Sequence, residues 1–138
     1  MKKIFNRTIF FHPILFGVYP ILALLAYNIK EIRPIVAFRA GLASLVFCIL
    51  LFMVVWLILK NVSKTAIAST FLLVMFYSYG QIYELIEGRK ILGFLVGRHI
   101  ILLTVWIMII ALGMLWIFKN SGDLKNLNQI LNVVSVLL

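Results

Sequence analysis

Long apolar segments, each bounded by charged or polar residues, constrain this chain of 138 residues more than any other feature. An α-helix needs roughly 20 apolar residues to cross a hydrocarbon core about 30 Å thick. Four segments are long enough, and they cover residues 9–27, 35–59, 66–83 and 100–118. A fifth apolar run covers residues 130–138 and reaches only about 14 Å at 1.5 Å per residue, so we expect an incomplete fifth span.

Composition excludes an ordinary soluble domain. Hydrophobic residues make up 64% of the chain and charged residues 12%, against about 45–50% and about 25% in soluble domains. We therefore predict an all-α fold, a polytopic helical membrane protein in which residues 1–138 form one transmembrane domain with four full spans and an incomplete fifth. Pro20 is expected to kink the first span, and Ser63 or Thr65 is expected to cap the third.

The distribution of basic residues gives only a weak orientation. Lysine and arginine number seven on the N-terminal side of the predicted topology and six on the other. The seven are Lys2, Lys3, Arg7, Lys60, Lys64, Lys119 and Lys125, and the six are Lys30, Arg33, Arg39, Arg89, Lys90 and Arg98. Because the basic leader precedes the first span and no cleavage pattern follows it, we predict an uncleaved span and a cytoplasmic N-terminus. Five crossings would then place whatever follows Leu138 on the outer side.

The densest group of polar side chains lies at the outer end of the third span. On a helix, Tyr77, Gln81 and Glu84 share one face, while Tyr79 and Tyr83 form a second stripe. The predicted topology brings further polar side chains to the same leaflet from the second and fourth spans. They include Arg39, Arg98 and His99.

Two interpretations of this group stay open. In the functional one, Arg39, Arg98 and His99 bind an anionic lipid headgroup or a lipid-linked phosphate together with the tyrosine hydroxyls. In the structural one, the two arginines pair with Glu84 or Glu87 and connect spans two, three and four. The net charge of +9 favours membrane lipids with anionic headgroups as partners, and no nucleic acid is expected.

We predict no catalytic residue, metal ligand or cofactor within the chain. His12 and His99 are the only histidines, and the topology places them at opposite faces about 30 Å apart. His12 is expected to be an interfacial residue. Hydroxyls inside the spans are expected to bond to a carbonyl one turn earlier, and only Ser78 is placed to approach His99. Cys48 has no partner in the chain, so we expect a small side chain that faces lipid or another helix.

Three stretches carry a family resemblance when taken together. They are residues 12–28 (HPILFGVYPILALLAYN), 76–83 (FYSYGQIY) and 97–99 (GRH). They resemble the N-terminal membrane region that precedes sulfatase-like domains of the alkaline phosphatase superfamily, in bacterial membrane proteins akin to lipoteichoic acid synthases and phosphoethanolamine transferases. The likeness covers nearly the whole chain, but it rests on short aromatic motifs and not on a catalytic signature.

The resemblance implies a bacterial plasma-membrane protein with an extracytoplasmic hydrolase or transferase domain after the last span. The membrane region would then be a non-catalytic anchor, with an outer surface that docks a lipid substrate. The alternative hypothesis is a complete small integral membrane protein, an accessory subunit or lipid-binding scaffold whose residues 130–138 pack against a partner helix. A small proton-coupled transporter fits less well, because all four acidic residues lie at span ends or in loops.

Overall fold

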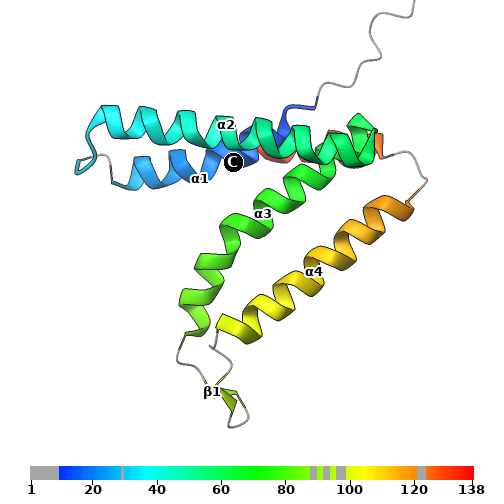
Figure 1. The fold of residues 1–138 in the computed structure, drawn as a ribbon. Coiled ribbons are helices and arrows are strands. Elements are labelled where there is room, and N and C mark those ends of the chain that lie inside the picture. Colours follow the sequence, from blue (N-terminus) through cyan, green and yellow to red (C-terminus); the bar gives the residue numbers. More distant parts are fainter. Residues whose placement is uncertain (1–9, 29, 88–89, 92–93, 96–98, 121–123) are drawn as a thin grey trace, which may run out of the picture.

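A computed structural model describes residues 10–28, 30–87, 90–91, 94–95, 99–120 and 124–138. In this part of the chain, five helices and one short antiparallel strand pair are present (Figure 1). The helices are α1 (His12–Tyr27), α2 (Pro34–Leu59), α3 (Val62–Ile86), α4 (His99–Lys119) and α5 (Lys125–Leu137), and the strands are β1 (Lys90–Ile91) and β2 (Phe94–Leu95). Three helices, α2, α3 and α4, are long and apolar enough to cross a membrane, and α1 is a shorter apolar helix.

The predicted helical fold is confirmed, and the helices indicate a membrane location; the number of crossings stays a prediction. The four long apolar segments match α1 to α4 with boundaries that differ by at most four residues. The last helix differs more, because α5 begins at Lys125 and not near Ile130. Hydropathy identifies only the apolar part of that helix, because Lys125, Asn126 and Asn128 make its first turn mainly polar.

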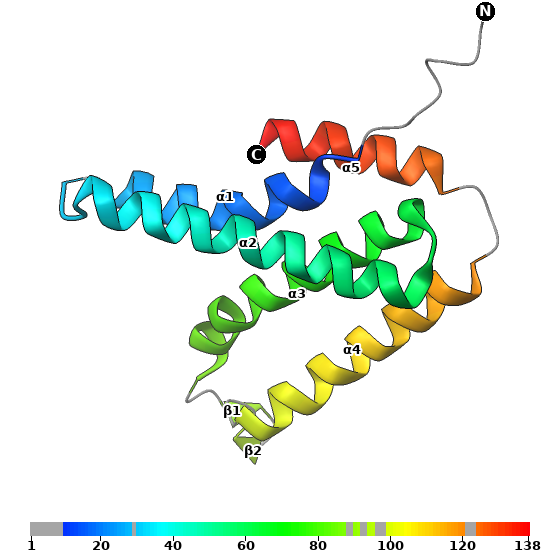
Figure 2. The same cartoon turned by 45° about the horizontal axis from the view of Figure 1, so that its top comes forward.

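The helices form two antiparallel pairs arranged as a V (Figures 1 and 2). One arm is α1 with α2, and the other is α3 with α4. The arms meet at the closed end, which holds the turn between α2 and α3, the end of α4 and the start of α5. They diverge at the open end, which holds the α1–α2 connection and the strand pair. Helix α5 lies alongside α1.

Helix α3 is the central element of the bundle. It packs against α1, α2, α4 and α5. In its most apolar stretch of 18 residues, 44% of the residues are buried, against 17% for α2 and 11% for α4. The buried run from Thr65 to Thr70 consists mainly of small residues, which let neighbouring helices approach closely. Asn61 caps this helix by accepting a hydrogen bond from the Lys64 amide at 3.1 Å, so the predicted cap at Ser63 or Thr65 is wrong.

A glycine sets the contact between α1 and α2. A Cβ atom added at Gly17 would collide with the Cys48 Sγ atom. The Ser44 hydroxyl donates a hydrogen bond to the Gly17 carbonyl at 2.7 Å. Cys48 is therefore buried against another helix, which is one of the two environments expected for it.

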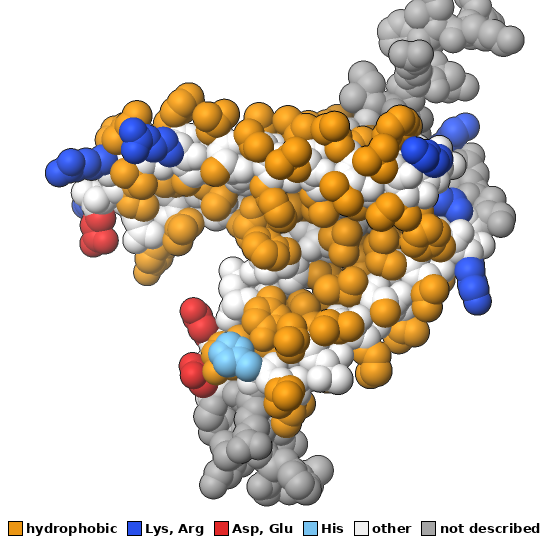
Figure 3. Space-filling model, viewed as in Figure 1, with side chains coloured by type: hydrophobic (Ala, Val, Ile, Leu, Met, Phe, Trp, Pro, Cys, Tyr) orange, Lys and Arg blue, Asp and Glu red, His pale blue; other side chains and the backbone are white. Residues whose placement is uncertain are grey.

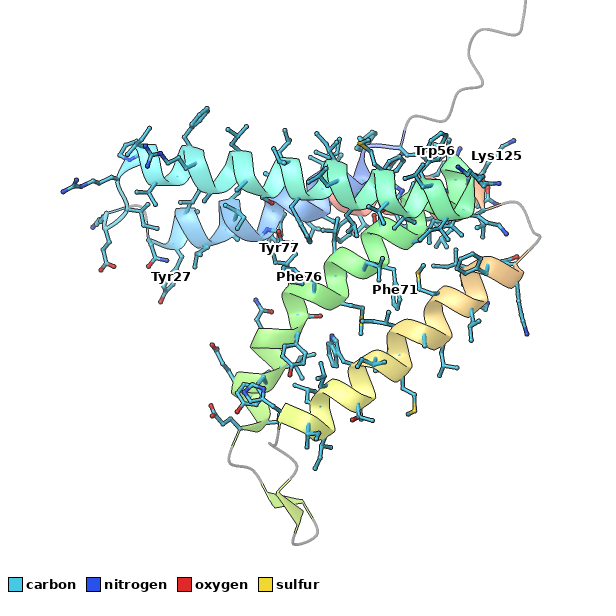
Figure 4. The ribbon with its side chains drawn as sticks, viewed as in Figure 1. Tyr27, Trp56, Phe71, Phe76, Tyr77 and Lys125 are labelled. Atoms are coloured by element: carbon cyan, nitrogen blue, oxygen red, sulfur yellow. The ribbon has the colours of Figure 1, made fainter. Side chains whose placement is uncertain are left out.

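Helix α4 is held mainly by α3. The ring of Phe71 points toward α4 (Figure 4) and occupies the space that a side chain at Gly113 would need. Closer to the open end, Trp106 Nε1 donates a hydrogen bond to the Met75 carbonyl at 2.9 Å. The outer face of α4 carries exposed apolar side chains, as does much of the bundle surface (Figure 3). Such a surface is typical of helices that face lipid or other membrane helices.

Charged side chains differ between the two ends (Figure 3). The closed end carries Lys60, Lys64, Lys119 and Lys125. The acidic residues within the described ranges all lie at the open end; they are Glu31, Glu84 and Glu87. Lys64 also stabilises the end of α4, because its Nζ donates to the Phe118 carbonyl at 3.0 Å.

Candidate functional site

A buried polar network lies at the closed end. His12 is 0% exposed. Its Nδ1 lies 2.6 Å from the Thr70 hydroxyl, and its Nε2 lies 2.9 Å from Asn128 Oδ1. Instead of the expected interfacial side chain, His12 is an internal residue that α5 covers. The sequence did not indicate this, because its partners lie 58 and 116 residues away.

Asn128 determines how the hydrogen bonds of this network run. Its Nδ2 lies 3.3 Å from the Ser63 carbonyl, 2.7 Å from the Ser63 hydroxyl and 3.0 Å from the Leu124 carbonyl. Two carbonyl acceptors require the amino side of the amide there, so Oδ1 faces His12. A neutral His12 ring then donates from Nε2 and accepts the Thr70 hydroxyl proton at Nδ1. Every polar atom of the His12 ring and the Asn128 side chain has a partner.

A second asparagine of α5 holds the start of α1. Asn132 Oδ1 accepts hydrogen bonds from the backbone amides of Phe11 and His12, at 3.3 and 3.2 Å. Helix α1 has no side-chain cap from its own N-cap residue, so α5 supplies one. Helix α5 thus turns Asn128 and Asn132 toward the protein, while Val133 and Val136 on its other face are exposed.

The open end carries a more exposed group, which we call the aromatic cluster: Tyr79, Tyr83, Glu87 and His99. The Tyr79 hydroxyl lies 3.3 Å from His99 Nδ1. The Tyr83 ring stacks on the His99 ring, with centroids 3.7 Å apart and planes 10° apart. The Tyr83 hydroxyl donates to Glu87 Oε1 at 3.1 Å. The cluster brings the end of α3 onto the first turn of α4.

An apolar cleft of about 390 Å³ adjoins this cluster between α2, α3 and α4. Tyr79 belongs to both: its hydroxyl contacts His99, while its ring lines the cleft and meets Trp106 edge to face at 5.9 Å. The lining residues are Phe47, Leu51, Leu72, Met75, Phe76, Tyr79, Leu103, Trp106 and Ile110. The cleft therefore offers an apolar, aromatic wall with one polar edge.

The structure divides the predicted polar group. Tyr79, Tyr83 and His99 come together, as the helical stripe and the topology suggest. Tyr77 instead points to the α1–α2 arm, where its hydroxyl lies 3.2 Å from the Ser44 hydroxyl (Figure 4).

The other predicted residues lie outside the aromatic cluster. Gln81 and Glu84 are exposed on α3. Arg39 is exposed near the start of α2, on the other arm of the V. Within the described ranges, Arg39 forms no ion pair with either glutamate that was expected to bind it, and Glu87 accepts from a tyrosine. Arg98 lies outside the described residues, so its role stays a prediction.

The sequence did not predict two features of the site, Trp106 and the apolar cleft. Trp106 and the cleft lie within uniformly apolar segments, where no local pattern distinguishes them from lipid-facing residues. Ser78 bonds to the Val74 carbonyl at 2.6 Å, so Tyr79 and not Ser78 reaches His99. Among the residues that the structure describes, no group of three or more His, Cys, Asp or Glu side chains is placed to hold a metal ion.

In comparisons with known proteins, no family model, no curated protein and no solved structure matches this chain.

Proposed function

We propose that the chain is an integral membrane module that binds a membrane lipid, with the headgroup at the aromatic cluster and an acyl tail in the adjoining cleft. The observation that supports this proposal is the position of Tyr79, whose hydroxyl belongs to the polar cluster and whose ring belongs to the apolar cleft. A lipid has the same division between a polar head and an apolar tail. Small-molecule sites typically combine an apolar wall with a few placed polar groups.

The polar edge suits a phosphate-bearing headgroup. When the Tyr79 hydroxyl donates to His99 Nδ1, the neutral ring carries its proton on Nε2 and presents that N–H as a donor. His99 also begins α4, where unpaired backbone amides favour an anion. In the sequence, Arg89, Lys90 and Arg98 accompany this end of the helix pair. These features support an anionic headgroup as the preferred ligand.

We assign the lipid site to an anchor module, following the resemblance to membrane regions of sulfatase-like proteins. In that role the module holds a lipid substrate at the outer face of a bacterial plasma membrane for a downstream extracytoplasmic domain. The basic leader before the first span supports an N-terminus on the cytoplasmic side. An accessory subunit or lipid-binding scaffold is the alternative.

Native mass spectrometry of the purified protein tests the lipid site. The protein is loaded with phosphatidylglycerol or phosphatidylcholine, and the number of retained lipids is counted. We expect one retained lipid with a preference for phosphatidylglycerol, and about tenfold weaker retention for His99→Gln, because a hydrogen bond to a charged group contributes about 1.5–3 kcal/mol. Tyr79→Phe should also weaken retention. Tyr27→Phe is the matched control, since Tyr27 lies at the end of α1 and is 91% exposed.

A second variant separates the tail from the headgroup. Leu103→Phe places a larger side chain at the cleft wall and leaves the aromatic cluster intact. It should reduce retention of long-chain lipids, whereas Leu112→Phe, on an exposed part of the same helix, should not. Unchanged retention in both His99→Gln and Leu103→Phe would reject the proposed site.

A further inference from the structure

The apolar cleft beside the aromatic cluster has a measurable depth. Helix α4 runs from the open end toward the closed end, and α3 runs the other way (Figure 1). Leu103 lines the cleft near the start of α4, and Ile110 lines it seven residues deeper. On α3, Leu72 lies seven residues deeper than Tyr79. At about 1.5 Å per residue, the cleft therefore extends about 10 Å from the aromatic cluster toward the closed end.

The cleft ends on a floor of packed side chains. Its lining residues nearest the closed end are Leu51, Leu72 and Ile110, one from each of the three helices. Leu51 and Leu72 also pack against the hydrophobic core of the closed end. That core consists of Val55, Ile67, Ala68, Ile117 and Leu124. The floor is thus a part of the folded core and not a gap between two helices.

The space between α3 and α4 is filled just beyond this floor. Phe71 points toward α4 and occupies the space next to Gly113, which lies about one turn beyond Ile110 (Figure 4). A chain that followed α4 past Ile110 would therefore meet the Phe71 ring. Closer to the open end, the hydrogen bond from Trp106 Nε1 to the Met75 carbonyl fixes the cleft wall on α4. The depth of the cleft is set by side chains that other contacts hold in place.

This depth is smaller than the length of an ordinary lipid tail. A hydrocarbon core about 30 Å thick gives each leaflet about 15 Å. A cleft about 10 Å deep accepts about two thirds of a tail that spans one leaflet. The remaining methylene groups would have to displace the floor or bend out between the arms of the V. Displacement is unfavourable, because packed interiors resist added methylene groups.

We propose that the floor formed by Leu51, Leu72 and Ile110 selects lipids by acyl-chain length. The site favours a tail that ends at the floor over one that spans the whole leaflet. The inference rests on the proposed lipid site and adds a chain-length specificity to it. The headgroup preference comes from the aromatic cluster, which lies at the other end of the cleft.

A competition experiment with one headgroup tests the floor. The purified full chain is mixed with equal amounts of dilauroyl-, dimyristoyl-, dipalmitoyl- and distearoyl-phosphatidylglycerol, and native mass spectrometry measures which lipid is retained. We expect the dilauroyl lipid to be retained about tenfold more than the distearoyl lipid, which is the lower end of the discrimination that a hydrophobic pocket achieves for one methylene group.

Two substitutions move the floor in opposite directions. Leu51→Ala deepens the cleft and should bring the retention ratio of the dilauroyl to the distearoyl lipid close to one. Ile110→Phe makes the cleft shallower and should raise that ratio. Leu57→Ala and Ile107→Phe, at exposed positions of the same two helices, should keep the wild-type ratio. Leu72→Ala replaces Leu51→Ala if the latter fails to fold.

The outcomes separate the floor from the lipid site. Equal retention of the four lipids by the wild-type chain, or a preference for the longest, would overturn the chain-length inference and leave the lipid site in place. A preference for short chains that neither floor substitution changes would also overturn it. Retention of none of the four lipids would reject the lipid site and the chain-length inference together.

Discussion

The closed-end network and the aromatic cluster use similar groups in different surroundings. Each contains one histidine bonded through Nδ1 to a hydroxyl, from Thr70 in one case and Tyr79 in the other. His12 is fully buried and both of its ring nitrogens have partners, whereas His99 is exposed and, among the described residues, is bonded through Nδ1 alone. A satisfied buried network stabilises the fold. An exposed group with unused donors is available to a ligand.

The comparison predicts the largest loss of stability for Asn128→Leu. This substitution leaves the buried His12 Nε2–H and the partly buried Ser63 hydroxyl without their Asn128 partner. We expect the free energy of unfolding in detergent micelles to fall by about 3 kcal/mol. Asn126→Leu, at an exposed position of the same helix, should change it by less than about 0.5 kcal/mol. Equal losses of stability in the two variants would contradict the structural role of the closed-end network, and with it the distinction from the aromatic cluster.

Gly17→Ala should have the next largest effect, because it forces apart the α1–α2 contact that supports the bundle between the two polar groups. A Cβ atom there meets Cys48 Sγ, and overpacking costs about 1–3 kcal/mol. The double variant Gly17→Ala/Cys48→Ala removes the sulfur and should recover most of the loss. Thermal unfolding of the single and double variants measures this, and additive losses would contradict the contact.

Asn132→Ala should cost less, about 1 kcal/mol, because it removes the cap that α5 provides for α1. The first turn of α1 should fray while the rest of the helix stays protected. Hydrogen exchange at the amides of Phe11 and His12, compared with those of the middle of α1, reports this directly. Uniform loss of protection along α1 would mean that Asn132 does more than cap.

The smallest effect on stability is expected at the aromatic cluster. His99→Gln should change the free energy of unfolding by less than about 0.5 kcal/mol, because the side chain is exposed. Lipid retention should nevertheless fall as described above. A large loss of stability in His99→Gln would make the cluster structural, which is the role that the buried network has.

Features that are encoded by neighbouring residues could be predicted from the sequence, whereas features that depend on distant contacts could not. Hydropathy located the apolar helices because each is encoded by consecutive residues, and helical periodicity placed Tyr79 and Tyr83 on one stripe. The buried network joins residues 58 to 116 positions apart, so no local signal marks His12 or Asn128. The divergence of the arms, which separates Arg39 from the cluster, depends on the packing around α3 and leaves no trace in composition.

The two histidines provide the most direct test of the central claim, that the open-end group binds a lipid phosphate and the closed-end group does not. Protein labelled with ¹⁵N at the histidine rings is placed in phosphatidylglycerol bilayers, and ¹⁵N–³¹P dipolar dephasing is measured by solid-state NMR. Spectra of His99→Gln assign the two residues. We predict dephasing of His99 by lipid phosphorus and none of His12. Dephasing of His12, or of neither histidine, would contradict the account.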